Sequence, residues 1–145
     1  MEDSKTSRIE LQEESPSKET KKEIWLAKAV IKKDGKYLLL FRAPGHIYED
    51  LWDFPGGRIK HGETPEEAVT REVNEETSLT IDPGKQISTT THEDMKYILN
   101  YTFFKPKDSK GEITLSGDHT KSGWFTKEEI KNLEIHSSIS TYFGW

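Results

Sequence analysis

The chain has 145 residues and a formal net charge of −5, with 32% hydrophobic residues, 10% aromatic residues and no cysteine. This length and apolar content allow one compact core but hardly two, and the negative charge argues against duplex nucleic acid as a partner. Without cysteine the chain cannot form a disulfide, a thiolate metal site or a thiol nucleophile.

The first 23 residues differ in composition from the rest of the chain. They are charged and rich in serine, with Met1, Ile9 and Leu11 as their only apolar side chains. We therefore predict a disordered charged tail over 1–23 and a single domain over 24–145. The longest apolar run, YLLLF, is far too short to span a membrane, and the N-terminus lacks the apolar core of a signal peptide, so we expect a cytoplasmic protein without membrane association.

Two strand-like runs open the predicted domain. WLAKAVIK (25–32) and KYLLLFR (36–42) flank the turn residues Asp34 and Gly35, a pattern that predicts a β-hairpin. A loop and the turn-rich segment LWDFPGGRIKHGE (51–63) follow.

A helix with clear start signals comes next. Thr64 can act as the N-cap, Pro65 suits the first helical position, and Glu67 completes a capping box with Thr64. We predict that this helix runs over 65–77.

The second half of the chain predicts further strands and two short helices. QISTTTH (86–92) and KYILNYTFF (96–104) are strand-like, KPKDSKG (105–111) is turn-like, and GWF (123–125) indicates a short strand. A second capping box, Thr126 with Glu129, opens a helix through about Leu133, and a short C-terminal helix can follow it.

The helix over 65–77 carries an unusual cluster of carboxylates. At about 100° per residue, Glu72, Glu75 and Glu76 share an arc of roughly 100° beside an apolar stripe of Val69 and Val73. Glu72 and Glu76 are like charges four residues apart, which weakens an isolated helix by roughly a few tenths of a kcal/mol. The cluster is either a solvated acidic face or a site for a cation.

Features on the N-terminal side of the helix favour the cation site. Gly56 and Gly57 allow the backbone to approach a ligand or a helix closely, although they also suit a tight turn. Glu63 can return to the helix and pair with Arg71, either in support of a site or as a surface ion pair.

Taken together, the segment GGRIKHGETPEEAVTREVNEETSL resembles the Nudix box of the Nudix hydrolase family. Nearly every fixed position of the box is met, and the one departure is Ser78, where the family has glycine. The resemblance extends over about 25–133 and implies an α/β fold, an α/β/α sandwich around a mixed β-sheet. It also implies hydrolysis of a nucleoside diphosphate linked to another group.

The resemblance assigns roles to the residues of the box. Glu72 and Glu76 would be the principal ligands of Mg²⁺ or Mn²⁺, together with the Gly56 carbonyl, and such hard cations prefer oxygen ligands. Glu75 would hold a metal or its water and serve as general base. Three further residues would support the site without touching substrate: Gly57, Glu63 and Arg71.

Residues outside the box are less strongly indicated. Asp118 resembles an additional carboxylate ligand of the family, but a solvated Asp in the turn SGDHT explains it equally well. The five histidines are not closely paired as in a zinc site and are treated as non-ligands. Candidate substrate contacts are cations for phosphate and tyrosines for stacking on a base: Arg42, Arg58, Lys60, Tyr48 and Tyr97.

The sequence thus favours a metal-dependent pyrophosphohydrolase whose preferred substrates are nucleoside triphosphates or damaged nucleotides. We expect a monomer or a homodimer. Dinucleoside polyphosphates and nucleotide sugars such as ADP-ribose are alternative substrates. The other class of function is a Nudix module that binds nucleotides without hydrolysis. The three neighbouring glutamates favour the enzyme, because a module without catalysis has no chemical need for mutually repelling carboxylates.

Overall fold

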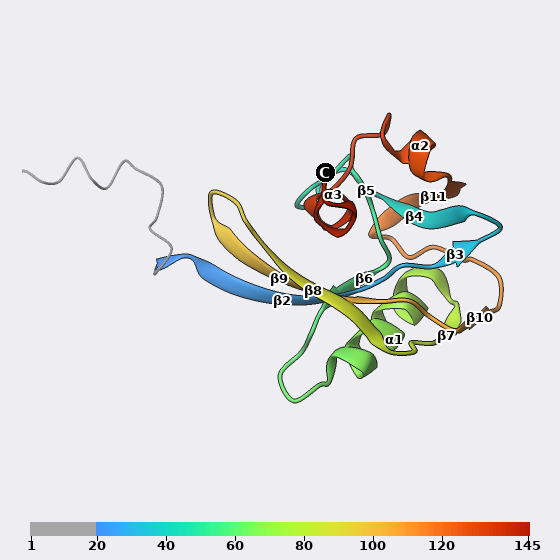
Figure 1. Cartoon of the computed structure of the whole chain (residues 1–145), viewed down its shortest axis with the longest axis horizontal. Helices are drawn as coiled ribbons and strands as arrows, with labels where there is room; N and C mark the ends of the chain where they lie inside the picture. The colour runs from blue at the N-terminus through green and yellow to red at the C-terminus, as the bar shows by residue number, and fades with distance from the viewer. Residues whose placement is uncertain (1–19) are drawn as a thin grey trace, which may run out of the picture.

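The computed structural model describes residues 20–145 (Figure 1). Residues 1–19 of the predicted tail lie outside the described residues. The first strand of the mixed sheet begins at Lys22, two residues before the predicted start of the domain at residue 24.

The strands and helices of the described residues are labelled in the order of the chain. Their bounds are β2 (Lys22–Ala29), β3 (Lys32–Lys33), β4 (Lys36–Arg42), β5 (Trp52–Asp53), β6 (Gly56–Arg58), α1 (Pro65–Thr77), β7 (Thr80–Asp82), β8 (Gln86–Glu93), β9 (Tyr97–Phe104), β10 (Asp108–Lys110), β11 (His119–Phe125), α2 (Lys127–Ile130) and α3 (Ser137–Phe143).

Helix α1 confirms the prediction over 65–77. The Thr64 side chain accepts a hydrogen bond from the Glu67 N–H, and the Glu67 side chain accepts one from the Thr64 N–H, so both halves of the capping box form. The second capping box, at Thr126 and Glu129, forms in the same way, although its helix ends at Ile130. The prediction of a turn over 105–111 is wrong in part, because this segment contains β10.

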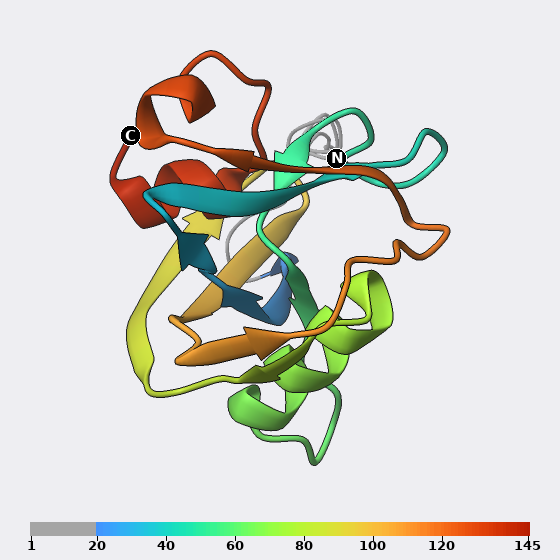
Figure 2. The same ribbon diagram turned by 90° about the vertical axis from the view of Figure 1, so that its right-hand side faces the viewer.

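A mixed sheet forms the centre of the molecule. Its strand order is β6-β2-β9-β8, with β2 parallel to β9 and the outer two pairs antiparallel. A second, antiparallel sheet joins β11, β4 and β3, and β5 also pairs with β4. The small ribbon of β7 and β10 runs beside α1 (Figure 2).

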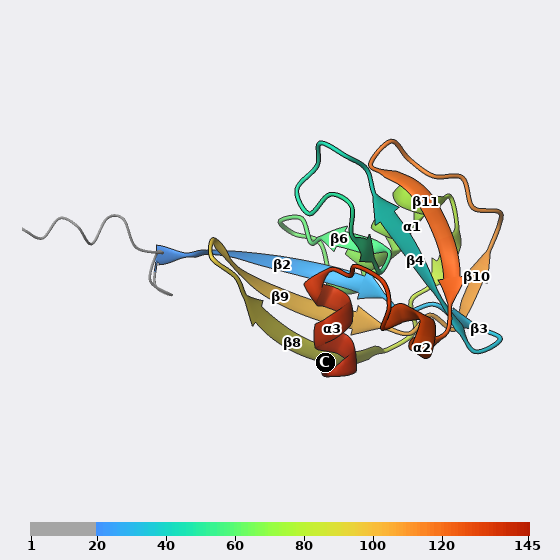
Figure 3. The same cartoon turned by 90° about the horizontal axis from the view of Figure 1, so that it is seen from above.

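The helices lie on opposite sides of the mixed sheet, with α1 on one side and α3 on the other (Figures 1 and 3). The buried apolar residues form two clusters, one beside α1 and one beside α3. Strand β4 contributes to both clusters, because side chains of a strand alternate in direction. Leu38 and Leu40 pack in the cluster that contains Val69 and Val73 of α1, while Leu39 packs in the cluster that contains Ile139 of α3. This arrangement confirms the α/β class with a mixed sheet between helices. Among the described residues, no helix has both the length and the apolar character needed to cross a membrane.

Candidate active site

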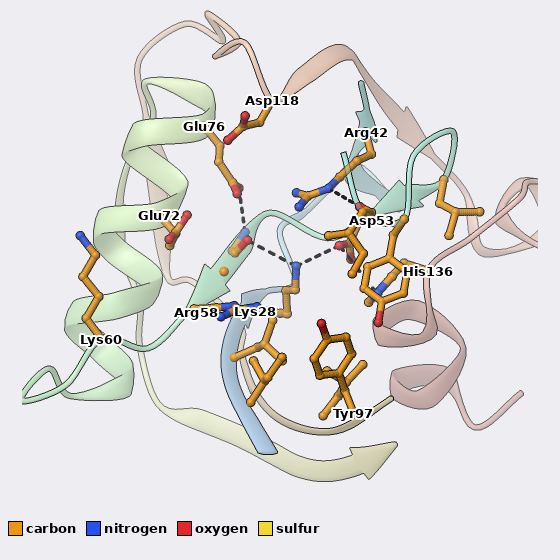
Figure 4. Close-up of a pocket in the computed structure, with 18 residues that line it drawn as sticks. Lys28, Arg42, Asp53, Arg58, Lys60, Glu72, Glu76, Tyr97, Asp118 and His136 are labelled. Carbon is orange, nitrogen blue, oxygen red and sulfur yellow. Dashed lines mark hydrogen bonds and ion pairs between the residues drawn. The ribbon is translucent and has the colours of Figure 1, made fainter. Parts of the chain in front are cut away.

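A cavity of about 430 Å³ opens between the mixed sheet, α1 and the loop that joins β4 to β5 (Figure 4). One end carries carboxylates of α1 and the backbone of β6, and the remainder combines cations with apolar and aromatic side chains. The lining contains ten of the residues singled out in the sequence: Arg42, Tyr48, Gly56, Gly57, Arg58, Lys60, Glu72, Glu76, Tyr97 and Asp118.

The carboxylates of α1 lie directly against the glycines of β6. A Cβ atom at Gly57 would lie 2.6–2.9 Å from the carboxyl atoms of Glu72, so only glycine leaves room for that carboxylate. Gly56 has a φ of 133°, and a Cβ there would lie 2.2 Å from the Ala27 carbonyl oxygen. Gly57 therefore permits the close approach of strand and helix that the sequence suggested, whereas Gly56 permits the close approach of β6 to β2.

Glu76 is the buried member of the acidic cluster. Its Oε1 accepts a 2.9 Å hydrogen bond from the Gly56 N–H. Burial raises the pKa of Glu76 to about 8, and the Lys28 ammonium and the Gly56 N–H offset this only in part. A proton or a metal cation can therefore neutralise this carboxylate.

Arg71 ties the acidic residues of the site together. Its Nε donates to Glu63 Oε2 at 2.7 Å, which confirms the predicted ion pair, and its Nη2 donates to Glu63 Oε1 at 3.0 Å. Its Nη1 donates to Glu72 Oε2 at 3.0 Å and to Glu75 Oε1 at 3.1 Å. The hydrogen bond from Arg71 lowers the pKa of Glu63 to about 2.

Glu75 and Asp118 occupy different places relative to the cavity. The Glu75 side chain is 56% exposed, is bound to Arg71 and is not among the residues that line the cavity. Asp118 lines the cavity and lies 3.5 Å from His46 (Oδ1 to Nε2). Asp118 thus shares a cavity with Glu72 and Glu76 (Figure 4), whereas Glu75 stands outside it.

The donor set of the cavity suits a hard divalent cation. Two carboxylates, of Glu72 and Glu76, face the backbone of Gly56 and Gly57, and carboxylate and carbonyl oxygens are the ligands that Mg²⁺ and Mn²⁺ prefer. Within residues 20–145, no three His, Asp or Glu side chains are already grouped closely enough to hold a metal ion. Arg71 instead binds two of the carboxylates, of Glu72 and Glu75.

The five predicted substrate contacts all line the cavity, but two of them already have partners. Arg42 Nε donates to the Ile47 carbonyl at 3.0 Å, and the Tyr48 hydroxyl donates to Asp94 Oδ2 at 2.8 Å. Phe41, which precedes Arg42 on β4, packs against Trp52 with ring centroids 5.2 Å apart and is not among the lining residues.

A buried polar network on the cavity floor was not predicted. Lys28 Nζ donates to Asp53 Oδ2 at 3.0 Å, and Ser138 Oγ donates to Asp53 Oδ1. Burial alone would raise the pKa of Asp53, but the Lys28 ammonium and the Ser138 hydroxyl lower it. The Asp53 carboxylate is therefore ionised at neutral pH.

His136 completes this network in its neutral form, since burial lowers its pKa despite the nearby Asp53 carboxylate. Its Nδ1 accepts from the Ser138 N–H at 3.2 Å, which leaves the proton on Nε2. Nε2 has no hydrogen-bond partner among the described residues, and the Tyr48 ring lies 4.4 Å from the imidazole ring.

The NUDIX domain family model matches residues 24–143, and the chain therefore belongs to the Nudix family. The match includes all of α1, the glycines of β6 and the cavity-lining residues of the C-terminal region. The family resemblance of the acidic segment is thus confirmed.

Three relatives illustrate the range of the family around this chain. A MutT-like protein of Streptomyces ambofaciens is 30% identical over 105 residues, which are 72% of this chain and 64% of that protein. The CTP pyrophosphohydrolase of Escherichia coli K12 is 28% identical over 108 residues, covering 74% of this chain and 79% of that protein. The ADP-ribose pyrophosphatase of Methanocaldococcus jannaschii is 46% identical over 122 residues, covering 80% of this chain and 70% of that protein.

The fold is also similar to solved structures. The crystal structure of a MutT protein from Methanosarcina mazei Go1 superposes with a TM-score of 0.78 at 26% sequence identity, and the match covers 86% of this chain and 93% of that one. The chain therefore has the α/β Nudix fold.

Proposed function

We propose that this protein is a metal-dependent hydrolase that cleaves a pyrophosphate bond, by attack of water, in a nucleoside diphosphate linked to another group. The observation that carries the proposal is the division of one cavity into two parts. Carboxylates of Glu72 and Glu76 face the glycines of β6 at one end, and cations and tyrosines line the rest. A substrate with a polyphosphate and a planar base matches both parts.

Glu72, Glu76 and the Gly56 carbonyl would hold Mg²⁺ or Mn²⁺, with Asp118 as a further candidate that lines the same cavity. A bound divalent cation supplies neutralisation of phosphate charge and a more acidic water molecule. The protein contributes the arrangement of its ligands. Gly57 leaves space for Glu72, and the Gly56 N–H fixes Glu76.

The remaining residues of the acidic cluster act on protons and on geometry. Arg71 orients Glu72 and Glu75 while Glu63 orients Arg71, so the helix and the loop before it are held together. Glu75, which is exposed, would accept the proton of the attacking water once its bond to Arg71 loosens.

Nucleoside triphosphates or their damaged forms are the first substrate class that we propose. Arg42, Arg58 and Lys60 line the cavity and can neutralise a polyphosphate, while Tyr48 and Tyr97 can stack on a base. The relatedness to a CTP pyrophosphohydrolase supports this class. ADP-ribose is the second candidate, because the 46% identity to an ADP-ribose pyrophosphatase extends over 122 residues.

A panel of substrates tests the proposal. The four ribonucleoside triphosphates, an oxidised deoxynucleotide, a dinucleoside tetraphosphate and ADP-ribose would each be incubated with Mg²⁺ or Mn²⁺, and products separated by ion-exchange chromatography. We expect metal-dependent cleavage of one pyrophosphate bond, fastest with a triphosphate. Tight nucleotide binding without turnover in any reaction would instead establish a non-catalytic module.

A further inference from the structure

Lys28 is a buried cation on the floor of the cavity. The residue is 4% exposed, and its ammonium group has three acceptors: Asp53 Oδ2 at 3.0 Å, the Gly56 carbonyl at 3.3 Å and the Phe54 carbonyl at 3.4 Å. Figure 4 shows the first two of these contacts. An ammonium group has three hydrogens, so protein acceptors use all of them. Lys28 lies outside the segment 56–79 that resembles the Nudix box.

Gly56 connects Lys28 with the acidic helix. Its carbonyl accepts from Lys28, and its N–H donates to Glu76 Oε1 at 2.9 Å. The backbones of Lys28 and Gly56 also pair in the β2–β6 ladder, so closely that a Cβ at Gly56 would lie 2.8 Å from the Lys28 Cα. The lysine thus reaches the same glycine through its main chain and its side chain.

Asp53 holds the other side of the Lys28 ammonium. It accepts from Lys28 through Oδ2 and from Ser138 Oγ through Oδ1, so it is fixed by the first turn of α3. A continuous series of contacts therefore runs from α3 through Asp53, Lys28 and Gly56 to Glu76 on α1. Figure 4 shows its part from Asp53 to Glu76.

We propose that Lys28 is a positioning residue for hydrolysis: its ammonium fixes the backbone of residues 54–56 so that the Gly56 N–H holds Glu76 and the Gly56 carbonyl faces the cavity. The inference rests on the proposed function as far as turnover is concerned. The effect on the Gly56 backbone is independent of it.

The geometry favours positioning over direct contact with a substrate phosphate. Lys28 has no ammonium hydrogen left for a phosphate, whereas Arg58 and Lys60 also line the cavity and are exposed. A phosphate contact would also require Lys28 to leave Asp53, a buried carboxylate whose charge would then lose its main partner.

The absence of cysteine from the whole chain permits a direct chemical test. Lys28→Cys would be alkylated in urea with 2-bromoethylamine, which gives a lysine analogue with an ammonium group, or with 1-bromopropane, which gives an apolar side chain of similar length. Both forms would be refolded. Lys33→Cys, at an exposed position of β3, treated in the same two ways, controls for the effects of alkylation and refolding.

The first readout is hydrogen exchange of the Gly56 amide in the metal-free protein, measured by NMR. The reference is the amide of Val30, a buried residue whose N–H donates to the Phe104 carbonyl. We expect the Gly56 amide to exchange about tenfold faster in the propyl form than in the aminoethyl form, with Val30 unchanged. Equal Gly56 exchange in the two forms would overturn the proposal.

The second readout is steady-state kinetics on the best substrate of the panel. We expect kcat to fall by about tenfold in the propyl form, to recover in the aminoethyl form, and KM to change little. A higher KM with unchanged kcat would instead make Lys28 a substrate contact. If the parent protein hydrolyses nothing, the proposed function fails, and the exchange measurement still decides the role of Lys28.

A second variant covers the case in which the propyl form does not refold. Lys28→Met combined with Asp53→Asn removes both charges, so no unpaired charge is buried, and the amide introduced at position 53 keeps an oxygen for the Ser138 hydroxyl. Its Gly56 amide should exchange about tenfold faster than in the Asp53→Asn single variant, in which Lys28 remains. The same exchange rate in both would refute the positioning role.

Discussion

The Gly56 N–H donates a 2.9 Å hydrogen bond to Glu76 Oε1, and this bond joins the strand that precedes the acidic helix to the buried carboxylate on it. Burial raises the pKa of Glu76 to about 8, so without a metal ion this carboxyl group is mostly protonated at neutral pH. The state of this one carboxylate should therefore affect both turnover and stability.

Replacement of Glu76 by Gln should remove most of the activity and keep the fold. The Gln side chain retains an oxygen that accepts the Gly56 N–H, but it carries no charge for a metal ion. We expect turnover to fall by roughly a hundredfold. Melting without metal should stay level near pH 5 and rise relative to the parent toward pH 8, because Gln is neutral at every pH and needs no proton to be buried. Full turnover by the Gln variant would refute the assignment of Glu76 as a metal ligand.

The stability of the metal-free protein should depend on pH through Glu76. Between the ordinary glutamate pKa of 4.5 and the folded-state pKa of about 8, the folded protein keeps a proton that the unfolded chain releases. The free energy of unfolding therefore falls as pH rises through this window, by up to about 1.4 kcal/mol per pH unit. Urea unfolding in EDTA at about pH 5 to 8.5 measures this slope across the window.

Glu76→Gln is the matched control for the pH dependence, because Gln does not titrate. The free energy of unfolding of the Gln variant should increase relative to that of the parent as pH rises. This difference between the two proteins should become constant above about pH 8. A difference that is independent of pH would show that Glu76 titrates normally in the folded protein.

Replacement of Asp118 by Asn tests its assignment as an additional metal ligand. Asp118 lines the cavity with Glu72 and Glu76, so we expect the metal concentration that gives half-maximal turnover to rise by roughly tenfold. Asp108→Asn, on exposed strand β10, is the control and should leave the metal dependence unchanged. Unchanged turnover and metal dependence in the Asp118 variant would leave Asp118 as a solvated turn residue paired with His46.

The sequence predicted the parts of the fold that depend on residues close together in the chain. The capping box of Thr64 and Glu67 fixes the start of α1, and helical spacing alone places Glu72 and Glu76 on one face. The Glu63–Arg71 ion pair could also be predicted, because only eight positions separate the two residues. Strand β10 was missed because its polar sequence has no apolar alternation and it pairs through its backbone with β7.

The cavity floor could not be predicted in the same way. Lys28 and Asp53 lie on different strands, and Ser138 reaches Asp53 from a helix 85 positions away. Only the tertiary fold brings such side chains together. The one available signal was a lysine in the middle of the apolar run WLAKAVIK, because a charge there must be either exposed at a sheet edge or buried with a partner.

Ser78 is the one departure of this chain from the Nudix box, and it adopts the strained conformation that glycine would otherwise supply. It ends α1 with φ 68° and ψ 3°, in the left-handed region, and its N–H donates to the Asn74 carbonyl at 2.8 Å. The serine hydroxyl adds a 3.3 Å hydrogen bond to the Thr114 carbonyl. The helix therefore ends in the left-handed turn typical of glycine, although the residue is serine.

Ser78→Gly should stabilise the protein by up to about 1 kcal/mol with little change in turnover. Glycine relieves the strain of the left-handed conformation. We expect this gain in free energy to exceed two losses, namely the greater entropy of the unfolded chain and the 3.3 Å hydrogen bond to Thr114. Gly144 gives a matched control, since it ends α3 at φ 76° with space for a Cβ, and Gly144→Ser should destabilise by a similar amount. Melting of both variants measures the strain. A clear loss of stability in Ser78→Gly would show that the hydroxyl contributes more than the strain costs, and a gain in turnover of about tenfold would mean that the serine impairs the site.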